Sequence, residues 1–475
     1  MAFPRIIIAA LRGGSGKTIV SVGMIASWRK RGMAIAPFKK GPDFIDAGWL
    51  ALAAGHPCHN LDTFLMPTDR ILLSFTNRTL ATDLAVIEGN RGLYDGIDLE
   101  GSTSTSELAK LLKAPVILIV DCTKTTRTVA AMVLGCLRFD PEVDICGVIL
   151  NRVAGARHES ILRKTIEQYC AVPVLGAIPK IKGEAFPERH MGLVPTPEHD
   201  WADESVEKAA GMAGRYLDLD RVFAIAGQAP PLTANKIPPN PPLEKVSEGG
   251  FFPPPPEPSP RIGVIRDAAF QFYYPENLEA LEAAGAEIVT VSALADARLP
   301  SMDGLYIGGG FPETHAQALA ENKDFREDVR RLSQKGLPIY AECGGLMYLG
   351  ESLVLDDKVY PMGGVFPVIF GFSKRPQGHG YTIFEVEKPN PYFKPGVSVR
   401  GHEFHYSKVL SWRGEAGDLA FRMTRGIGFA GKRDGLCYKN TLATYTHVHA
   451  LGTPSWAEAM VEASKKQAQG IGRKA

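Results

Sequence analysis

The chain has 475 residues, of which 45% are apolar and 22% charged, and its formal net charge is +1. These values are typical of a globular protein with two domains of ordinary size, and they exclude bulk electrostatic attraction to nucleic acid or to an anionic membrane. We see no apolar run of the roughly 18–20 residues that a membrane span needs. The seven cysteines are scattered without a CxxC pair. We therefore expect no disulfide framework or structural zinc site, and a cytoplasmic location.

A proline-rich stretch divides the chain. Residues 229–260 hold 12 of the 35 prolines, and proline favours an extended chain that cannot donate hydrogen bonds to a sheet. We therefore predict a first domain at 1–228, a linker at 229–260, a second domain at 261–462 and a frayed tail at 463–475.

Apolar segments alternate with helical patterns on both sides of the linker. In the first domain we expect buried strands at 5–11, 83–89, 114–121, 144–151 and 173–179, with helices at 16–32 and 106–113. In the second domain we expect strands at 261–267, 286–294, 304–309 and 337–343, with helices at 276–285 and 323–336. This alternation is typical of α/β folds, so we predict two α/β domains, the first a doubly wound parallel sheet.

A glycine-rich turn follows the first expected strand and opens the first expected helix. It reads GGSGKT and consists of Gly13, Gly14, Ser15, Gly16, Lys17 and Thr18. Small residues let backbone N–H groups surround a phosphate, the lysine adds a cation near the β- and γ-phosphates, and the threonine can ligate Mg²⁺. The usual phosphate loop begins with glycine where this chain has Leu11. We predict an ATP site here, the alternative being a glycine turn without a ligand.

Acidic and basic residues gather in two later segments, PFKKGPDFID and VIEGNRGLYDG. Their candidate site residues are Lys39, Lys40, Asp43, Asp46, Glu88 and Asp95. Carboxylates beside lysines suit a site that handles Mg²⁺, phosphate and a polyanionic substrate. Glu88 ends a strand, as a Walker-B acid does. The alternatives are a solvated charged loop for the first segment and a simple turn around Asp95.

Asn151 ends another expected strand. A polar side chain at that sheet edge could recognise the adenine of ATP. An ordinary strand-to-loop cap is the equally weighted alternative.

The second half carries the pattern of a thiol hydrolase. Cys343 lies in AECGG, between an expected strand and a helix, where a sharp turn presents a nucleophile and a helix N-terminus favours the thiolate. His447 and His449 in TYTHVH follow a later strand, and alternation places them on one face. We expect one histidine to act as the base of Cys343 and the other to orient it.

A second glycine loop, GGGFPE, follows the strand at 304–309. Its N–H groups could stabilise an oxyanion. The expected donors are Gly309, Gly310 and Gly344. His402 and His405 of RGHEFHYS cannot be given a role from their spacing.

Eight motifs in this order resemble the cobyrinate a,c-diamide synthase family: GSGKT, KKGPDFID, EGxxGLYDG, RDxAFQFYYPENL, GGGFPE, AECGGLMYL, RGHEFHYS and TYTHVH. The resemblance implies a dethiobiotin-synthetase-like ATP domain followed by a class I glutaminase domain. It implies ATP and Mg²⁺ as cofactors, with Thr18, Asp43 and Glu88 on the metal, and Asp43, Asp46 and Asp95 in the amidation. It also implies Cys343 as nucleophile and His447 as its base.

The implied reaction is the ATP-dependent amidation of the a and c acetates of cobyrinic or hydrogenobyrinic acid, with ammonia from glutamine. The expected partners are therefore glutamine, ATP and a corrinoid or other tetrapyrrole, with no nucleic acid or membrane, and a homodimer is left open. This chain reads GPDFIDA and EGNRG where the family commonly has GPDYIDP and EGVMG, so sirohydrochlorin or sirohaem is an alternative substrate. A P-loop partitioning or metal-trafficking ATPase with an inactive glutaminase-like domain is the alternative from another class.

Overall fold

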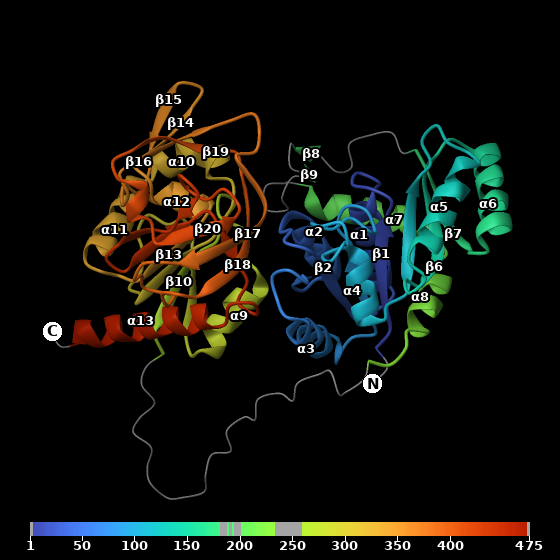
Figure 1. Ribbon diagram of the computed structural model, residues 1–475, viewed down its shortest axis with the longest axis horizontal. Helices are drawn as coiled ribbons and strands as arrows, with labels where there is room; N and C mark the ends of the chain where they lie inside the picture. The colour runs from blue at the N-terminus through green and yellow to red at the C-terminus, as the bar shows by residue number, and fades with distance from the viewer. Residues whose placement is uncertain (1–2, 181–187, 190–191, 194–200, 233–258, 473–475) are drawn as a thin grey trace, which may run out of the picture. The chain divides into compact units, whose positions relative to one another are not determined.

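A computed structural model describes residues 3–180, 188–189, 192–193, 201–232 and 259–472. The chain divides into two compact units, Met1–Pro242 and Leu243–Ala475, each built around a largely parallel sheet (Figure 1). Most of the expected proline-rich linker, residues 233–258, lies outside the described residues. In the part of the chain that the structure describes, we find no helix with the length and apolar character to cross a membrane.

The first unit contains a seven-stranded sheet of the order β3-β2-β4-β1-β5-β6-β7, with all neighbouring strands parallel. Its strands are β1 (Arg5–Ala10), β2 (Ile35–Lys40), β3 (His59–Leu61), β4 (Leu84–Glu88), β5 (Val116–Asp121), β6 (Ile145–Val153) and β7 (Val174–Pro179). The five expected strands are all present, and the structure adds β2 and β3. Strand β1 lies between β4 and β5, so the loop that follows it leaves from the middle of the sheet.

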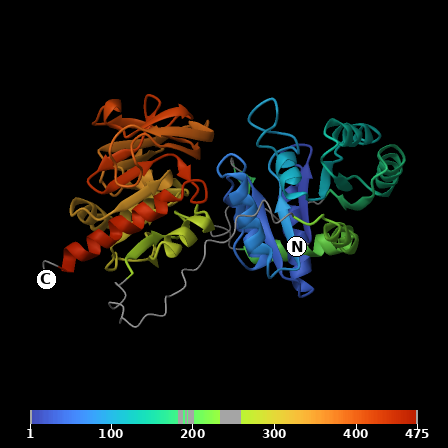
Figure 2. The same ribbon diagram turned by 60° about the horizontal axis from the view of Figure 1, so that its bottom comes forward.

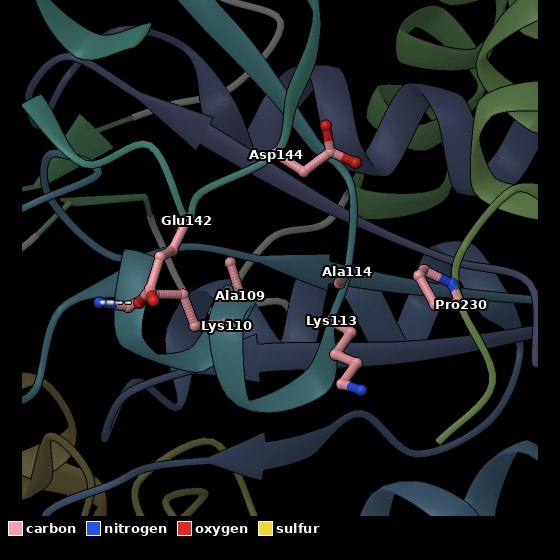
Figure 3. A pocket seen from close by; sticks show the side chains of 7 residues that line it. All are labelled: Ala109, Lys110, Lys113, Ala114, Glu142, Asp144 and Pro230. Carbon is pink, nitrogen blue, oxygen red and sulfur yellow. Dashed lines mark ion pairs between the residues drawn. The ribbon is translucent and has the colours of Figure 1, made fainter. Parts of the chain in front are cut away.

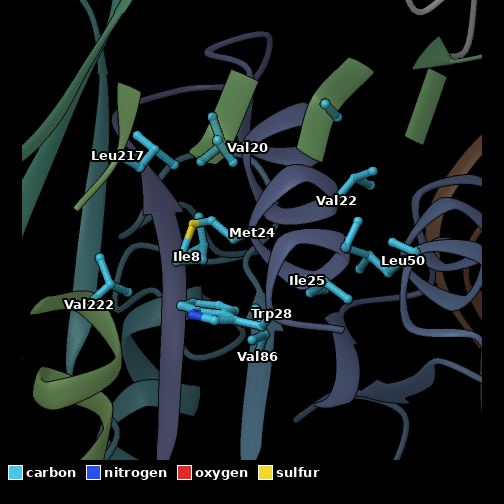
Figure 4. Close-up of a cluster of buried hydrophobic side chains, with 14 of the residues drawn as sticks. Ile8, Val20, Val22, Met24, Ile25, Trp28, Leu50, Val86, Leu217 and Val222 are labelled. Carbon is cyan, nitrogen blue, oxygen red and sulfur yellow. The ribbon is translucent and has the colours of Figure 1, made fainter. Parts of the chain in front are cut away.

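Helices cover both faces of this sheet. They are α1 (Lys17–Lys30), α2 (Ile45–Ala54), α3 (Thr68–Thr79), α4 (Thr105–Leu112), α5 (Thr128–Phe139), α6 (Ala156–Cys170), α7 (Ala202–Tyr216) and α8 (Leu219–Gly227), with a small ribbon β8 (Glu188–Arg189) and β9 (Gly192–Leu193). Ile6 and Ile8 of β1 face a core formed with α1, α2, α7 and α8 (Figure 4). On the other face, Phe75 of α3 packs on Phe38 of β2 with ring centroids 5.3 Å apart.

Helix α1 occupies the centre of that core. Trp28 is 1% exposed among the apolar side chains drawn in Figure 4. The neighbouring helix α7 comes so close that a Cβ on Gly23 would lie 2.4 Å from the carbonyl oxygen of Ala209. The tight contact fixes α1, and therefore the loop at its N-terminus, against the rest of the unit.

A buried arginine, Arg5, lies at the beginning of β1, at the end of the strand away from the phosphate-loop side. The guanidinium of Arg5 donates to the carbonyl oxygens of Phe3 (2.9 Å), Leu112 (2.6 Å), Lys113 (3.2 Å) and Pro230. Burial lowers the pKa of Arg5 to about 10. Pro230 belongs to the stretch that we expected to be linker, and in the same stretch Ala229 and Leu232 are buried. The beginning of that stretch is therefore packed onto the first unit.

The second unit has a six-stranded sheet of the order β11-β10-β12-β13-β23-β22, parallel except for β22. Its strands are β10 (Arg261–Ile265), β11 (Glu287–Val291), β12 (Gly304–Ile307), β13 (Ile339–Glu342), β22 (Leu436–Tyr438) and β23 (Thr441–Thr444). Its helices are α9 (Pro275–Ala283), η3 (Pro312–His315), α10 (Ala316–Glu321), α11 (Lys323–Gln334), α12 (Gly344–Leu349), η4 (Ala416–Asp418) and α13 (Ser455–Gly472). The four strands expected from the sequence are present.

Two antiparallel-rich sheets complete this unit (Figure 2). One has the order β15-β14-β16-β19 and the other β21-β20-β17-β18-β24. Their strands are β14 (Ser352–Leu355), β15 (Lys358–Pro361), β16 (Val368–Phe372), β17 (Gly378–Val386), β18 (Ser398–His405), β19 (Ser407–Trp412), β20 (Phe421–Arg425), β21 (Arg433–Asp434) and β24 (His447–Val448). The second sheet matters for the site because β18 and β24 each carry histidines.

The C-terminal segment corrects one expectation. We expected a frayed tail from residue 463, but helix α13 continues to Gly472. Ser464 is fully buried, donates to the carbonyl of Met460 at 2.9 Å, and lies where a Cβ on Gly304 of β12 would meet it at 2.3 Å. The polar sequence of this segment did not predict the contact, because a single small residue, Ser464, is enough to pack the helix against a glycine of the sheet.

Candidate functional site

The loop between β1 and α1 has the geometry of a phosphate site. Gly14 and Gly16 have φ of +70° and +91°, a conformation that favours glycine. Nothing lies within 4 Å of a Cβ built on Gly13 or Gly14, so the loop has room for an anion. The first turn of α1 has no side-chain cap in the described structure, which leaves its N–H groups for a ligand.

Lys17 is held across this loop. Its Nζ donates to the carbonyl oxygen of Arg91 at 2.8 Å. Burial and the nearby Lys39 lower the pKa of Lys17, and the carboxylates around it act in the opposite direction. The lysine is therefore a partly desolvated cation whose charge a phosphate would stabilise.

Asn151 is hydrogen-bonded to the phosphate loop. Its Nδ2 donates to the carbonyl oxygen of Ser15 at 2.8 Å, and its Oδ1 accepts from the N–H of Arg152 at 2.9 Å. A Cβ on Gly16 would lie 2.4 Å from the same amide nitrogen. Each polar atom of Asn151 therefore has one partner inside the protein, as the strand-to-loop cap predicts, and its contact with adenine stays a prediction.

Three carboxylates surround one buried lysine at the ends of β2 and β4. The Nζ of Lys39 lies 2.6 Å from Asp46, 2.6 Å from Glu88 and 3.8 Å from Asp43. The side chains of Lys39 and Glu88 are 1% and 0% exposed. Thr18 Oγ1 of α1 donates to Glu88 at 3.0 Å. The structure thus brings together the residues that the sequence proposed for metal and substrate.

The pKa values in this cluster diverge. Burial and the charge of Asp46 raise the pKa of Asp43 to about 7. Burial acts on Asp46 in the same direction, but Lys39 outweighs it and the pKa of Asp46 is lowered. Burial raises the pKa of Glu88. Two neighbouring aspartates with opposite shifts are typical of sites that bind a cation or transfer a proton.

The oxygen atoms present suit Mg²⁺ bound together with a nucleotide. Among the described residues, no three His, Cys, Asp or Glu side chains form a complete metal centre. Mg²⁺ commonly uses one or two carboxylates and completes its shell with phosphates and water. Thr18, Glu88 and an aspartate at position 43 or 46 would supply such a partial set.

Two further sequence candidates lie beside this cluster. Asp95 accepts the N–H of Gly92 at 2.8 Å, as the turn alternative anticipated, but its charge also raises the pKa of Lys17. Lys40 is buried, and its pKa is lowered by burial and raised by Asp62. Lys40 therefore has a different electrostatic environment from the adjacent Lys39.

In the second unit, Cys343 sits on a sharp turn between β13 and α12. Its backbone has φ 48° and ψ −98°, a strained conformation for a non-glycine residue that is found at nucleophile elbows. Its Sγ donates to the carbonyl oxygen of Phe404 in β18 at 3.8 Å. Burial and then Glu313 raise the pKa of Cys343, against the opposing N–H of Gly344. The N–H at the start of α12 lowers the pKa of Cys343 as expected, but burial outweighs it and favours the thiol.

The glycine loop lies next to the elbow. A Cβ on Gly344 would meet the backbone nitrogen of Gly310 at 3.0 Å, so these two expected oxyanion donors are neighbours. Gly309 differs, because its N–H donates to the carbonyl oxygen of Phe272 at 3.3 Å. That bond corrects its assignment as a donor and leaves Gly310 and Gly344 as the candidates.

His447 lies between the glycine loop and a buried carboxylate. Its Nδ1 is 3.2 Å from Oε2 of Glu342, the residue before the nucleophile. A Cβ on Gly309 would meet Cε1 and Nε2 of His447 at 2.4 and 3.1 Å. The imidazole therefore presents Nδ1 to Glu342 and its opposite edge to the glycine loop.

His449 has other neighbours. Its Nε2 is 3.7 Å from Oε2 of Glu276, and its Nδ1 accepts from the N–H of Leu451 at 3.2 Å. The ring of Tyr274 lies 4.5 Å away. The expectation that His449 orients the catalytic base is therefore not supported, since Glu342 occupies that position on His447.

The two histidines without an expected role, His402 and His405, lie on strand β18. His402 stacks on His447 with centroids 4.8 Å apart, and its pKa is held well below the usual value by burial and by the neighbouring imidazoles. Its Nδ1 is 3.1 Å from the hydroxyl of Tyr274. His405 instead stacks on Tyr445 at 3.7 Å. His402 thus lines the thiol site, and His405 supports it from a neighbouring position.

A surface pocket in the first unit is separate from these residues. It has a volume of about 390 Å³ and is lined by Ala109, Lys110, Lys113, Ala114, Glu142, Asp144 and Pro230 (Figure 3). Ala114 precedes β5, whereas the phosphate loop follows the carboxyl end of the parallel strand β1. The pocket therefore lies at the opposite edge of the sheet and takes no part in the candidate site.

Comparisons with known proteins give a match for each of the two units. Residues 6–193 match the model of the CobQ/CobB/MinD/ParA nucleotide binding domain, and residues 261–455 match that of the CobB/CobQ-like glutamine amidotransferase domain. A cobyrinate a,c-diamide synthase of Magnetococcus marinus is 46% identical over 456 residues, covering 96% of each chain. The chain belongs to the cobyrinate a,c-diamide synthase family.

Other members of the cobyrinate a,c-diamide synthase family are similar over nearly the full length. The relative from Archaeoglobus fulgidus is 41% identical and covers 98% of this chain and 99% of its own. That from Listeria innocua is 39% identical and covers 97% and 100%. The two domain models match this chain in the order that the motifs predicted.

Proposed function

We propose that the protein amidates the a and c acetate carboxylates of cobyrinic or hydrogenobyrinic acid in cobalamin biosynthesis, using ATP and ammonia from glutamine. The observation that supports this most is that one family member contains two separate groups of candidate catalytic residues. One unit has Lys17, Thr18 and Glu88 around a phosphate loop, and the other has Cys343 and His447 beside a glycine loop.

The first unit would activate the carboxylate. A carboxylate oxygen attacks the γ-phosphorus of ATP, ADP leaves, and an acyl phosphate forms, which gives the acyl carbon a good leaving group. Lys17 and the N–H groups of the loop would hold the phosphates. Thr18, Glu88 and Asp43 or Asp46 would hold Mg²⁺, which supplies charge neutralisation during the transfer.

The second unit would release ammonia. Cys343 Sγ attacks the side-chain carbonyl carbon of glutamine, and the N–H groups of Gly310 and Gly344 face the oxyanion. His447 takes the thiol proton and returns it to the leaving nitrogen, so the C–N bond breaks as the thioester is left behind. Water then hydrolyses the thioester to glutamate. Ammonia attacks the acyl phosphate and expels phosphate.

Two variants test this division of labour. Cys343→Ala should abolish amidation with glutamine but retain amidation with a high concentration of ammonium, because only nitrogen release needs the thiol. Lys17→Ala should do the reverse and retain glutamate release from glutamine. The readout is the mass of the tetrapyrrole product, which changes by about one unit for each carboxyl converted. Failure of ammonium to restore the first variant would contradict the proposal.

The choice of macrocycle needs its own assay. Purified protein is incubated separately with cobyrinic acid, hydrogenobyrinic acid, sirohydrochlorin and sirohaem, each with ATP and glutamine. We expect two amides on a cobyrinate-type ring. Amidation of sirohydrochlorin or sirohaem alone would move the protein to another pathway, and absence of glutamate release with every substrate would favour a P-loop ATPase with an inactive second unit.

We also propose that the protein is cytoplasmic. All seven cysteines lie in described segments and are free, which agrees with a reducing compartment such as the cytoplasm. A homodimer can be tested by sedimentation of the full chain.

A further inference from the structure

We propose that Glu342, the residue immediately before the nucleophile, positions His447 and compensates its charge during glutamine hydrolysis. This inference rests on the proposed glutaminase function of the second unit. It assigns to a carboxylate on β13 the part that the sequence pattern had assigned to His449.

The contacts of Glu342 fix which nitrogen of His447 carries a proton. The carboxylate is 1% exposed. It accepts the N–H of Val448 at 3.0 Å and the hydroxyls of Tyr340 and Tyr306 at 3.1 and 3.2 Å. Both oxygens of Glu342 thus act as acceptors, so we assign the proton of neutral His447 to Nδ1, which faces Glu342 across the 3.2 Å contact.

The opposite nitrogen of His447 is then the acceptor of the ring. In neutral imidazole, a proton on Nδ1 leaves Nε2 as an acceptor. Nε2 is on the edge that faces the glycine loop, where a Cβ on Gly309 would come within 3.1 Å of it. A base is therefore directed toward the loop that adjoins Cys343, and Glu342 sets that direction.

His449 is engaged in a way that separates it from this task. Because its Nδ1 accepts from the N–H of Leu451, the proton of a neutral ring is on Nε2, which faces Glu276. This is the opposite tautomer to that of His447. The two histidines of the HxH motif thus have separate carboxylates, one next to the nucleophile and one on α9.

A buried carboxylate at this place has a chemical purpose. The thiol of Cys343 holds its proton at rest, since burial raises its pKa. When Sγ attacks glutamine, that proton moves to Nε2 of His447 and leaves an imidazolium in a buried site. The negative charge of Glu342 stabilises this imidazolium until Nε2 gives the proton to the leaving ammonia. No atom is transferred to or from Glu342.

The first experiment compares two matched exchanges in the full chain, Glu342→Gln and Glu276→Gln. Both carboxylates are buried and each faces one histidine of the pair. For Glu342→Gln we expect kcat of glutamine hydrolysis to fall by up to about 10⁴-fold, the loss that the analogous Asp-to-Asn exchange causes in a serine hydrolase triad, with KM for glutamine nearly unchanged. Glu276→Gln should keep most of the wild-type kcat. Amidation with ammonium should persist in both variants and shows that the first unit works.

The second experiment needs neither turnover nor a folded variant of Glu342. Histidine-selective ¹⁵N labelling of the wild-type protein reports the tautomer of each imidazole, with His447→Gln and His449→Gln spectra used for assignment. We expect a proton on Nδ1 of His447 and on Nε2 of His449.

Three results would overturn the inference. They are full glutaminase activity in Glu342→Gln, an equal loss in Glu276→Gln, or a proton on Nε2 of neutral His447. Failure of the proposed function is distinguishable, because the wild-type enzyme would then release no glutamate while the tautomers could still be read.

Discussion

Two adjacent lysines should respond in opposite ways to the same exchange. Lys39→Met removes the cation that lies 2.6 Å from both Asp46 and Glu88. Glu88 is 0% exposed, so its charge would stay buried without its partner. Breaking a buried ion pair from one side costs about 3–5 kcal/mol. In a unit of this size that corresponds to a drop of about 6–20 °C in Tm.

Lys40→Met is the matched control. Burial is the largest influence on Lys40 and lowers its pKa, with Asp62 acting against it. A lysine whose folded-state pKa lies below its unfolded value destabilises the fold while charged, so its removal should be neutral or stabilising. The two variants differ by one position and carry the same new side chain.

The assay is urea unfolding of the full chain, read by pulsed hydrogen exchange and mass spectrometry, so that peptides of β1, β2 and β4 report the first unit alone. The loss in Lys39→Met should be smaller at pH 5 than at pH 8, because Glu88, whose pKa is already raised by burial, can be protonated in acid. A loss below about 1 kcal/mol, or equal losses in both variants, would refute the electrostatic reasoning.

Three further predictions concern the first unit. Asp43 has a pKa of about 7 and must lose its proton before it binds a cation, so the affinity for Mg²⁺ with ATP should rise between pH 6 and 8 and level off above. Calorimetry should show a release of protons on binding, and Asp43→Asn should abolish that release. A wild-type affinity that does not change with pH would count against this prediction. Asn151→Ala removes one hydrogen bond to the phosphate loop, so Kd for ATP should rise about fivefold, for roughly 1 kcal/mol, without changing the preference for ATP over GTP; a changed preference would support the adenine role. Arg91 is exposed and close enough to lower the pKa of Lys40. Arg91→Ala should therefore raise KM for the polycarboxylate tetrapyrrole in steady-state assays and leave glutamine hydrolysis unchanged. An unaltered KM would place the substrate elsewhere.

The sequence predicted the parts of the fold that have strong apolar periodicity. The central strands are continuous apolar runs because helices cover both faces of each sheet. Strand β2 was missed because it ends in Lys39 and Lys40, two charged residues that hydropathy would place at the surface although both are buried. The antiparallel strands β17 and β18 were missed because their exposed and buried residues alternate irregularly.

For the sites, residue type and order predicted which residues meet, but not which atoms pair. The elbow at Cys343 and the cluster around Glu88 follow from strand ends that share one sheet edge. The partner of His447 did not follow, because Glu342 reads in the sequence as a neighbour of the nucleophile and not of a histidine 105 positions later. The glutamate of AEC was the available signal, since a charged residue at the end of a buried strand requires partners.

The hydrogen bonds of the Arg5 guanidinium determine where the chain can be cut into fragments. One of its four carbonyl acceptors belongs to Pro230, which a truncation at residue 228 would discard, together with the buried Leu232. A fragment intended to retain nucleotide binding should therefore end no earlier than 232, and shorter fragments should unfold at lower temperature, because a guanidinium that loses an acceptor in a dry site is costly.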